Sequence, residues 1–388
     1  MADTYTTTTR TSYGQRIMNS IKGVLFGIVM FLASFGVLYW NEGRADMSDV
    51  AKKAVVIEAS NVAANTGADG TLVSATGTVT ADTLIGDDLF LKPGPFYSVS
   101  RNVEVFAWVE TSTSTTKNNT GGSSTTETTY SYKKEWTNSP ADSSKFHVPE
   151  GHTNVMADIS DASKTVPTAM LEQYNFSPQA AKAPAPTQLS LQAANLSLTS
   201  NASLVDGTTF IFVRNSTTGT YSAPELGDVR VSYSTLAVPF EGTLFGKLNG
   251  SSIDAYVTPK GDTLYRAFLG GHDQAVAKLH SEYTASLWGL RLVGFLMMWM
   301  GLSALFGPIS IILDFLPIFG TISRSVIGMV TFAVAFVLSC VTIVISAILH
   351  SLIAVIVVCV LLLAAAIGGG VMWKKKQGAK KPAATPAT

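Results

Sequence analysis

The chain has 388 residues, of which 47% are hydrophobic and only 14% are charged, and its mean hydropathy is +0.28. This composition excludes a disordered or highly charged protein. Its 27 basic and 27 acidic residues cancel, so no overall basic field exists to hold nucleic acid. Both cysteines, Cys340 and Cys359, lie inside apolar runs, which excludes a disulfide framework in the hydrophilic parts of the chain.

The first apolar segment follows a short basic stretch. Residues 1–22 carry Arg10, Arg16 and Lys22, and residues 23–40 are uncharged and close to the roughly 20 residues that a membrane-spanning helix needs. No small-residue cleavage site follows the segment. We therefore expect residues 23–40 to form a retained signal anchor, preceded by a cytoplasmic N-terminal tail.

Residues 41–287 are hydrophilic and show mainly period-two alternation, which is typical of β-strands. They predict a large, mainly β luminal domain. Residues 111–129 are almost entirely Thr, Ser, Gly and Asn, and we expect them to form a mobile hairpin loop. A pair of strands is expected within residues 71–79, and further strands are expected at residues 103–110, 130–136, 189–198, 210–214, 229–236, 238–248 and 252–257.

Two helical patterns border this domain, at residues 47–57 and 275–287, with apolar residues spaced three and four apart. We expect both helices to dock the β domain close to the membrane. Residues 180–186 contain two prolines and are either a linker between halves of the domain or a surface loop.

The C-terminal part of the chain holds three further apolar segments. His350 alone divides the last two, which predicts a tight helical hairpin. Basic residues flank one face of all four spans, so the positive-inside rule places both termini in the cytoplasm. The expected order is a second transmembrane helix at 288–313, a cytoplasmic loop at 314–324, a third helix at 325–349, a fourth at 351–373 and a cytoplasmic basic tail at 374–388. The fold class is therefore an α+β membrane protein.

The sequence contains no positive case for an enzyme, because phosphate-binding glycine patterns and nucleophile elbows are both missing. His147, Glu150 and His152 could offer metal ligands, but Pro149 and Gly151 indicate a turn, and the spacing matches no helical zinc motif. We expect no catalytic residue, cofactor, metal or small-molecule substrate.

Small residues occur in two of the predicted helices at the spacing that allows close helix approach. Gly23 and Gly27 form one such pair, and Ser303 and Gly307 form another. These four residues are candidates for helix packing, either within the chain or between copies of it.

The residues that follow the first span combine an interfacial aromatic ring with charges that cannot enter hydrocarbon. They are Trp40, Asn41, Glu42, Gly43 and Arg44. Trp favours the membrane interface, and Glu42 and Arg44 need partners at the boundary. We predict that these five residues form a junction that fixes the first helix to the β domain.

The hexapeptide Trp40–Ala45 resembles the transmembrane protein 43 family, also called LUMA. The resemblance continues, in family order, through residues 101–110, 130–136, 227–232, 288–291 and 300–302. It implies a protein of the endoplasmic reticulum and nuclear inner membrane that organises the nuclear envelope. Its partners would be the lipid bilayer, other membrane proteins and itself, with lamina-type partners in a eukaryote that has a lamina.

The leading hypothesis is therefore a non-enzymatic membrane scaffold. The alternative is a channel or transporter component formed by the C-terminal helices, with Thr331, Ser339, Thr342 and Ser346 as candidate pore-lining hydroxyls. In a bacterium the protein would lie in the cytoplasmic membrane, with a periplasmic or extracellular domain.

Overall fold

A computed structural model describes residues 3–314 and 317–351. For residues 317–324 it describes the backbone alone. The chain divides into two compact units. The β unit contains residues 3–10, 45–117 and 125–283, and the helical unit contains the described residues of 11–44, 118–124 and 284–351. The predicted fourth helix at 351–373 lies outside the described residues except for Ser351, as do Cys359 and the basic tail.

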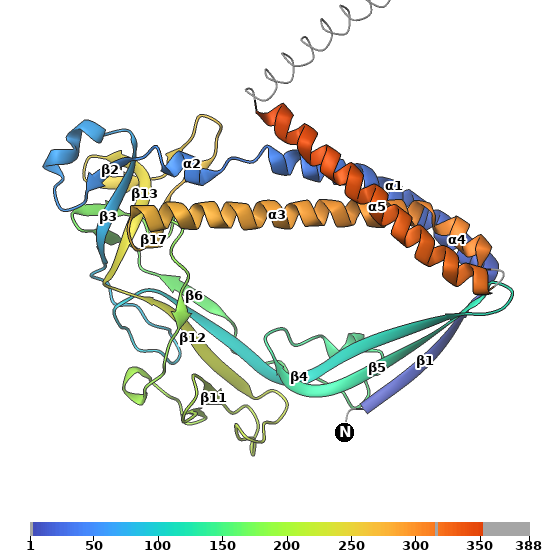
Figure 1. Cartoon of the computed structure of the whole chain (residues 1–388). Coiled ribbons are helices and arrows are strands. Elements are labelled where there is room, and N and C mark those ends of the chain that lie inside the picture. Colours follow the sequence, from blue (N-terminus) through green and yellow to red (C-terminus); the bar gives the residue numbers. More distant parts are fainter. Residues whose placement is uncertain (1–2, 315–316, 352–388) are drawn as a thin grey trace, which may run out of the picture. The chain divides into compact units, whose positions relative to one another are not determined.

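Five α-helices are described. Ser12 caps the first helix, because its hydroxyl accepts a hydrogen bond of 3.3 Å from the backbone N–H of Gln15. The helices are α1 (Tyr13–Glu42), α2 (Met47–Ala51), α3 (His272–Leu305), α4 (Gly307–Leu313) and α5 (Pro317–His350) (Figure 1).

Among the described residues, three helical segments are long and apolar enough to cross a membrane, at Tyr13–Ala51, His272–Leu305 and Ser325–His350. They confirm the predicted N-terminal span and two of the three predicted C-terminal spans, and the chain is an integral membrane protein.

The helix boundaries differ from the prediction at several points. The predicted span 288–313 is interrupted at Phe306, where Pro308 in the first turn of α4 lacks the N–H that a continuous helix would use. The predicted helix at 275–287 is not separate from the span, because α3 runs through both without a break. The predicted loop at 314–324 is also shorter, since α5 begins at Pro317.

The first sheet of the β unit has eight strands. Its backbone order is β1-β5-β4-β12-β11-β10, with β6 paired to β4 and β9 paired to β12. These strands are β1 (Asp3–Thr11), β4 (Phe96–Asn118), β5 (Ser124–Thr137), β6 (Ala162–Thr165), β9 (Thr187–Gln188), β10 (Ala202–Leu204), β11 (Ile211–Val213) and β12 (Val229–Ala237).

The second sheet has seven strands in the order β17-β13-β14-β8-β7-β3-β2. Strands β3 and β13 also pair directly, from Leu72↔Lys247 to Val79↔Phe240, so five of these strands close into a ring of pairings. The strands are β2 (Val55–Glu58), β3 (Leu72–Thr80), β7 (Ala169–Leu171), β8 (Tyr174–Phe176), β13 (Phe240–Asn249), β14 (Ser252–Asp254) and β17 (Arg266–Leu269).

Short elements complete the β unit. They are the two-stranded sheet of β15 (Tyr256–Val257) and β16 (Thr263–Leu264), and the 3-10 helices η1 (Ala63–Ala68), η2 (Ser143–Lys145) and η3 (Ala193–Asn195).

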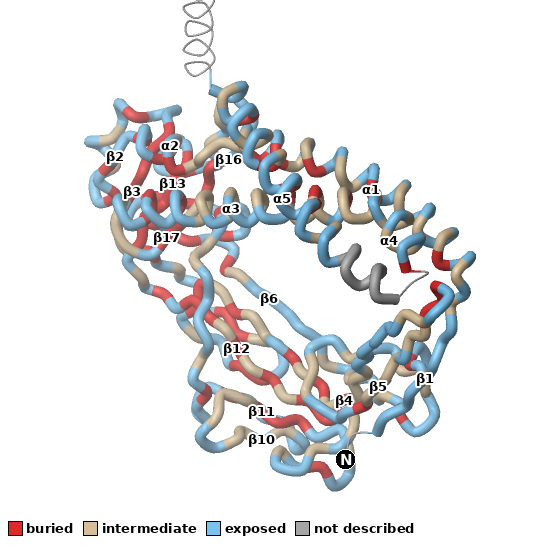
Figure 2. Tube along the Cα trace, turned by 45° about the vertical axis from the view of Figure 1, so that its right-hand side comes forward, coloured by how far each residue is buried: buried red, intermediate tan, exposed pale blue. Residues whose placement is uncertain are grey.

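One hydrophobic core lies between the two sheets. Alternate residues of β4 and β12, such as Val103, Val105 and Val231, are buried there together with Val73 and Leu244 of the second sheet. Figure 2 shows buried residues along β12 and around β3, β13 and β17. The period-two pattern therefore located the core-facing side of the main strands correctly.

A second cluster covers the other face of the second sheet. Phe245 and Phe268 pack against Ala51 of α2 and against Ala275 and Leu279 in the first turns of α3. The prediction that helical segments at both borders dock the β domain is confirmed for these residues. The helix predicted at 47–57 is shorter than expected, because α2 ends at Ala51.

Residues 111–129 form strands over most of their length. Strand β4 continues to Asn118 and β5 begins at Ser124, so only residues 119–123 form the turn. Cross-strand hydroxyl pairs line this ribbon, with Ser114 and Thr128 at 2.8 Å. The predicted mobile loop was wrong, because β-branched threonines favour extended backbone even where they bury little apolar surface.

Residues 3–11 form strand β1, which pairs with β5 at the edge of the first sheet. The side-chain oxygens of Thr6 and Thr129 lie 3.2 Å apart. The sequence predicted only a cytoplasmic tail at residues 1–22, whereas residues 3–11 are part of the sheet.

Candidate functional site: the polar junctions of the helical unit

The five residues of the predicted junction lie at the end of α1, and three of them, Asn41, Glu42 and Arg44, contact α3 within the helical unit. Glu42 accepts two hydrogen bonds of 2.8 Å from Arg291, one from Nε and one from Nη2. The Glu42 side chain is only 5% exposed. A buried carboxylate is tolerated where an opposite charge and good hydrogen-bond geometry compensate its lost hydration, and the two-point contact with Arg291 provides both.

Asn41 and Arg44 extend this contact along α3. Asn41 is fully buried, and its amide donates a hydrogen bond of 3.0 Å to the carbonyl oxygen of Leu287. The Arg44 guanidinium donates to the hydroxyl of Ser286 at 2.8 Å and to Asn41 Oδ1 at 3.3 Å. It also lies 5.6 Å from the ring centroid of Trp40. The junction therefore couples α1 to α3, whereas the sequence pattern predicted the β domain as its partner.

Gly43 brings the end of α5 into the same junction. A Cβ atom added at Gly43 would collide with the imidazole ring of His350. The His350 ring also lies 4.5 Å from that of Tyr39, centroid to centroid, and its Nδ1 is 2.8 Å from the carbonyl oxygen of Ser346. Only glycine leaves space for this ring, so Gly43 allows α5 to approach α1.

The candidate packing residues divide into close and open positions. A Cβ atom added at Gly27 would lie 2.8 Å from Ala304 Cβ and 2.9 Å from the carbonyl oxygen of Gly301, so α1 and α3 approach closely there. A Cβ at Gly23 meets nothing within 4 Å, and one at Gly307 would lie 3.9 Å from Ser20 Cβ.

Ser303 takes part in a different contact. Its hydroxyl lies 2.9 Å from that of Thr331, which links α3 to α5. Of the four predicted packing residues, Gly27 and Ser303 therefore lie at described helix contacts within this chain.

A second ion pair joins the opposite end of α1 to α4, and the sequence did not predict it. The Arg16 guanidinium contacts the Asp314 carboxylate, and it also donates to the carbonyl oxygen of Gly122 in the β4–β5 turn. Asn118 Nδ2 lies 3.4 Å from Asp314 Oδ2. Asp314 is fully buried. Its partner lies 298 residues away in sequence, beyond any local pattern.

The hydroxyls proposed to line a pore are packed between helices in the described part of α5. Thr331 and Ser339 are 2% and 3% exposed. Thr331 donates to the carbonyl oxygen of Ile327 at 2.7 Å, and Ser339 lies 3.4 Å from the sulfur of Met298. Thr342 donates to the carbonyl oxygen of Leu338 at 2.7 Å. The hydrogen bonds of these hydroxyls are therefore made within α5 and to a neighbouring helix.

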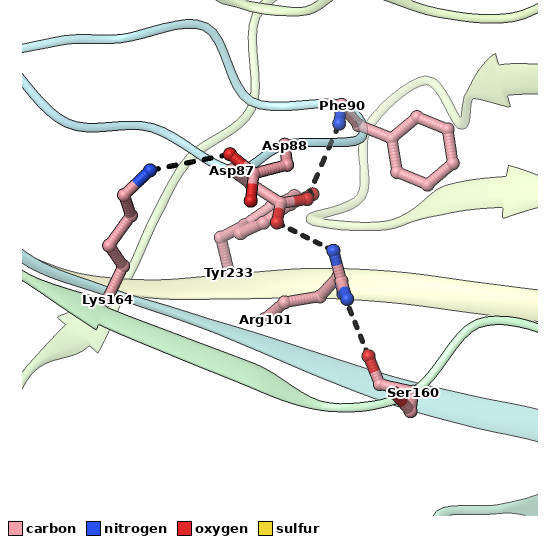
Figure 3. A network of polar contacts seen from close by, with 7 residues as sticks. All are labelled: Asp87, Asp88, Phe90, Arg101, Ser160, Lys164 and Tyr233. Atoms are coloured by element: carbon pink, nitrogen blue, oxygen red, sulfur yellow. Dashed lines mark hydrogen bonds and ion pairs between the residues drawn. The ribbon is translucent and has the colours of Figure 1, made fainter.

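The β unit contains a separate polar network, centred on Asp87 (Figure 3). Tyr233 donates to Asp87 Oδ2 at 2.5 Å, and Arg101 Nη1 donates to Oδ1 at 2.6 Å. Arg101 Nε also donates to the carbonyl oxygen of Ser160 at 2.9 Å. Burial opposes ionisation of Asp87, but these hydrogen bonds outweigh it and hold the pKa of the carboxyl below its usual range. Burial and the hydrogen bond to Asp87 both raise the pKa of Tyr233.

The histidines considered as metal ligands lie against aromatic rings instead. His147 stacks on Tyr130 with ring centroids 3.9 Å apart. His152 stacks on Tyr132 at 3.9 Å, and its Nδ1 lies 2.9 Å from the carbonyl oxygen of Val148. Burial and a hydrogen bond to Glu110 raise the pKa of Tyr132 to about 12. Among the described residues, no group of three or more His, Cys, Asp or Glu side chains could hold a metal ion.

The chain matches one family and several relatives over most of its length. The family model of Transmembrane protein 43 matches residues 105–352. Transmembrane protein 43 of Mus musculus is 27% identical over 350 residues, which cover 85% of this chain and 84% of the mouse protein. The human protein is 26% identical over 359 residues, covering 87% and 86% of the two chains.

The match extends to insects but not to solved structures. The Transmembrane protein 43 homolog of Drosophila melanogaster is 26% identical over 298 residues, covering 72% of this chain and 75% of the fly protein. No solved structure matches the chain. On the extent of the family match, this chain belongs to the transmembrane protein 43 family.

Proposed function

We propose that the protein is a non-enzymatic membrane scaffold that acts through protein–protein contacts and self-association. One observation carries the proposal, namely that charged side chains at both ends of α1 bind other helices of the same unit. Glu42 binds Arg291 of α3, and Arg16 binds Asp314 at the end of α4. Charges used in this way hold helices together, whereas a transport pathway needs polar groups that face a permeating ion.

Family membership supports a location for this scaffold. By resemblance, the protein acts in the endoplasmic reticulum and the nuclear inner membrane, where it organises the envelope with other membrane proteins. Lamina-type partners apply in a cell that has a lamina. The channel alternative is weaker for the described residues, because Thr331 and Ser339 are buried in helix contacts.

Self-association is tested with two differently tagged copies of the full chain, coexpressed and then extracted in mild detergent. We expect one tag to co-purify the other, and crosslinking in intact membranes before extraction to capture the same pair. The control mixes membranes from cells that each express a single copy, because association after extraction would then become visible. Recovery no greater than in this mixture would contradict the self-association.

The channel reading is tested separately by ion flux. The purified chain is reconstituted in liposomes loaded with a fluorescent ion indicator. A scaffold leaves the flux at the level of protein-free liposomes. Flux that rises with the amount of protein and changes in a Thr331→Val variant would contradict a purely structural role.

A further inference from the structure

A cavity of about 630 Å³ lies within the β unit, beside the first turns of α3. One side is formed by residues 182–185, the Pro- and Ala-containing segment that the sequence left open as a linker or a loop. The backbone of Lys182 pairs with that of Arg266 in an isolated bridge, which fixes this loop beside β17. The volume falls in the range of ordinary small-ligand sites.

Basic side chains outnumber acidic ones around the cavity. Its ionisable lining residues are Lys182, Arg266, Lys278 and Glu282. Arg266 binds Glu282 through two hydrogen bonds of 2.6 and 2.8 Å, which neutralises that pair. Lys278 Nζ is 4.0 Å from Glu282 Oε1, and both lysines are exposed. Three cations against one carboxylate leave two positive charges to attract an anion.

The Arg266 guanidinium is held by neighbouring side chains rather than by solvent. Its side chain is 15% exposed, and its Nε is buried without a hydrogen-bond partner among the described residues. The guanidinium lies 4.4 Å from the ring centroid of Phe268, which cannot accept an ordinary hydrogen bond. Because this Nε is closed off from solvent, the cations that a ligand in the cavity can reach are the exposed Lys182 and Lys278.

The remaining lining is apolar. Ala183, Pro184 and Phe268 line the cavity together with Leu269, which is 51% exposed. The cavity therefore combines a basic side with an apolar side, which suits a ligand that is both anionic and hydrophobic.

The position along α3 favours a lipid over an acidic peptide. Gln274, Lys278 and Glu282 are spaced by four residues and so share one face of the helix. The same helix reaches Trp288 six residues after Glu282, about 9 Å at 1.5 Å per residue. Tryptophan marks the membrane interface, where phospholipid headgroups are concentrated.

We propose that this cavity binds the headgroup of an anionic phospholipid, with its phosphate at Lys182 and Lys278 and its glycerol and upper acyl chain against Leu269 and Pro184. This inference goes beyond the scaffold function and does not depend on self-association. The site would give the β unit a preference for membrane regions rich in anionic lipid.

The test uses the purified full chain in neutral detergent, with lipid adducts counted by native mass spectrometry. Phosphatidic acid is compared with phosphatidylcholine of the same acyl chains. We expect preferential retention of phosphatidic acid, and an affinity about thirtyfold lower in the K182Q/K278Q variant, at about 1 kcal/mol for each lysine. The control variant K247Q/K260Q removes the same charge from exposed lysines outside the cavity lining and should bind normally.

A second variant tests the cavity itself. Ala185→Trp fills it from an exposed loop position without removing charge, and should reduce phosphatidic acid binding while leaving the melting temperature unchanged. An equal loss of phosphatidic acid binding in the K182Q/K278Q variant and in its K247Q/K260Q control would overturn the proposal. Displacement of the lipid by equimolar glycerol 3-phosphate would assign the site to a soluble phosphate instead. Tighter binding of an acidic peptide than of phosphatidic acid would assign it to a protein partner.

Discussion

The carboxylate of Glu42 and the guanidinium of Arg291 bind each other through two parallel hydrogen bonds of 2.8 Å, although 249 residues separate them in sequence. The contact joins the last turn of α1 to α3, and the Arg291 guanidinium also lies 4.7 Å from the ring centroid of Trp288. Trp288 and the buried Asn41 flank this ion pair. Together these contacts fix both the depth and the rotation of α1 against α3.

Replacing Glu42 by Ala should destabilise the protein by about 3 to 5 kcal/mol, because it leaves the Arg291 charge largely buried without its partner. Thermal unfolding in detergent measures this loss. The matched control is Glu150→Ala, at an exposed carboxylate in a turn, which should change stability by about 0.5 kcal/mol or less. The exchanged pair E42R/R291E should recover part of the loss, and equal stability of E42A and the wild type would show that the junction is incidental.

The glycine positions of α1 provide a comparison within one helix. Gly27→Leu should lower the melting temperature and loosen α1 from α3, since its side chain meets Ala304 and the Gly301 carbonyl within 3 Å. Gly23→Leu should be tolerated, because its Cβ meets nothing within 4 Å. If both variants unfold at the same temperature, the close approach of α1 and α3 at Gly27 contributes nothing to stability.

Asp87 makes the stability of the β unit depend on pH. Its pKa is lowered in the folded protein, so its contribution is fully present above the unfolded value near 4 and is lost as the pH falls through the folded value. Asp87→Asn should cost about 3 kcal/mol at pH 7 and flatten the decline in melting temperature between pH 5 and 3. An unchanged acid dependence in this variant would assign that decline to other carboxylates.

Hydropathy located the apolar helices of the described chain, because about 20 apolar residues are needed to cross hydrocarbon. It misplaced their ends. Residues 13–22 and 272–287 are helical, although they are polar enough to lie outside the hydrocarbon core of the bilayer. Hydropathy detects only the apolar part of such a helix. The β-domain prediction succeeded for β4, β12 and β13, where one face of the strand is buried. It failed at 189–198, which forms the short helix η3 and an isolated bridge at Leu196 instead of a strand.

The sequence predicted which residues form the junction but not what they bind. Glu42 and Arg44 were recognised because charges beside an apolar run need partners, a local argument. Their partners in α3 are more than 240 residues away, and no local pattern selects them. Arg16 was counted as a free cytoplasmic charge, whereas it is buried against Asp314. That pairing removes one of the cations on which the predicted orientation rested.

Strand β1 is the element with the largest consequence for topology. Its residues are mainly threonines without apolar alternation, so the sequence gave no reason to place them in a sheet. The chain leaves the β unit at residue 10 and returns to it at residue 45, with α1 between. We therefore expect β1 to pair with β5 in the folded protein, so that residues 3–10 belong to the β unit.

Disulfide formation between Thr6→Cys and Thr129→Cys, in native membranes and with Cys340 and Cys359 replaced by Ala, tests this claim most directly. The two hydroxyls lie 3.2 Å apart across β1 and β5, so the paired strands place the new thiols within reach of a disulfide. We predict rapid oxidation of this pair, and much slower oxidation of Thr7→Cys with Thr129→Cys, because Thr7 faces the opposite side of the strand. Two thiols that stay reduced under oxidant, while both still react with a maleimide, would contradict the pairing.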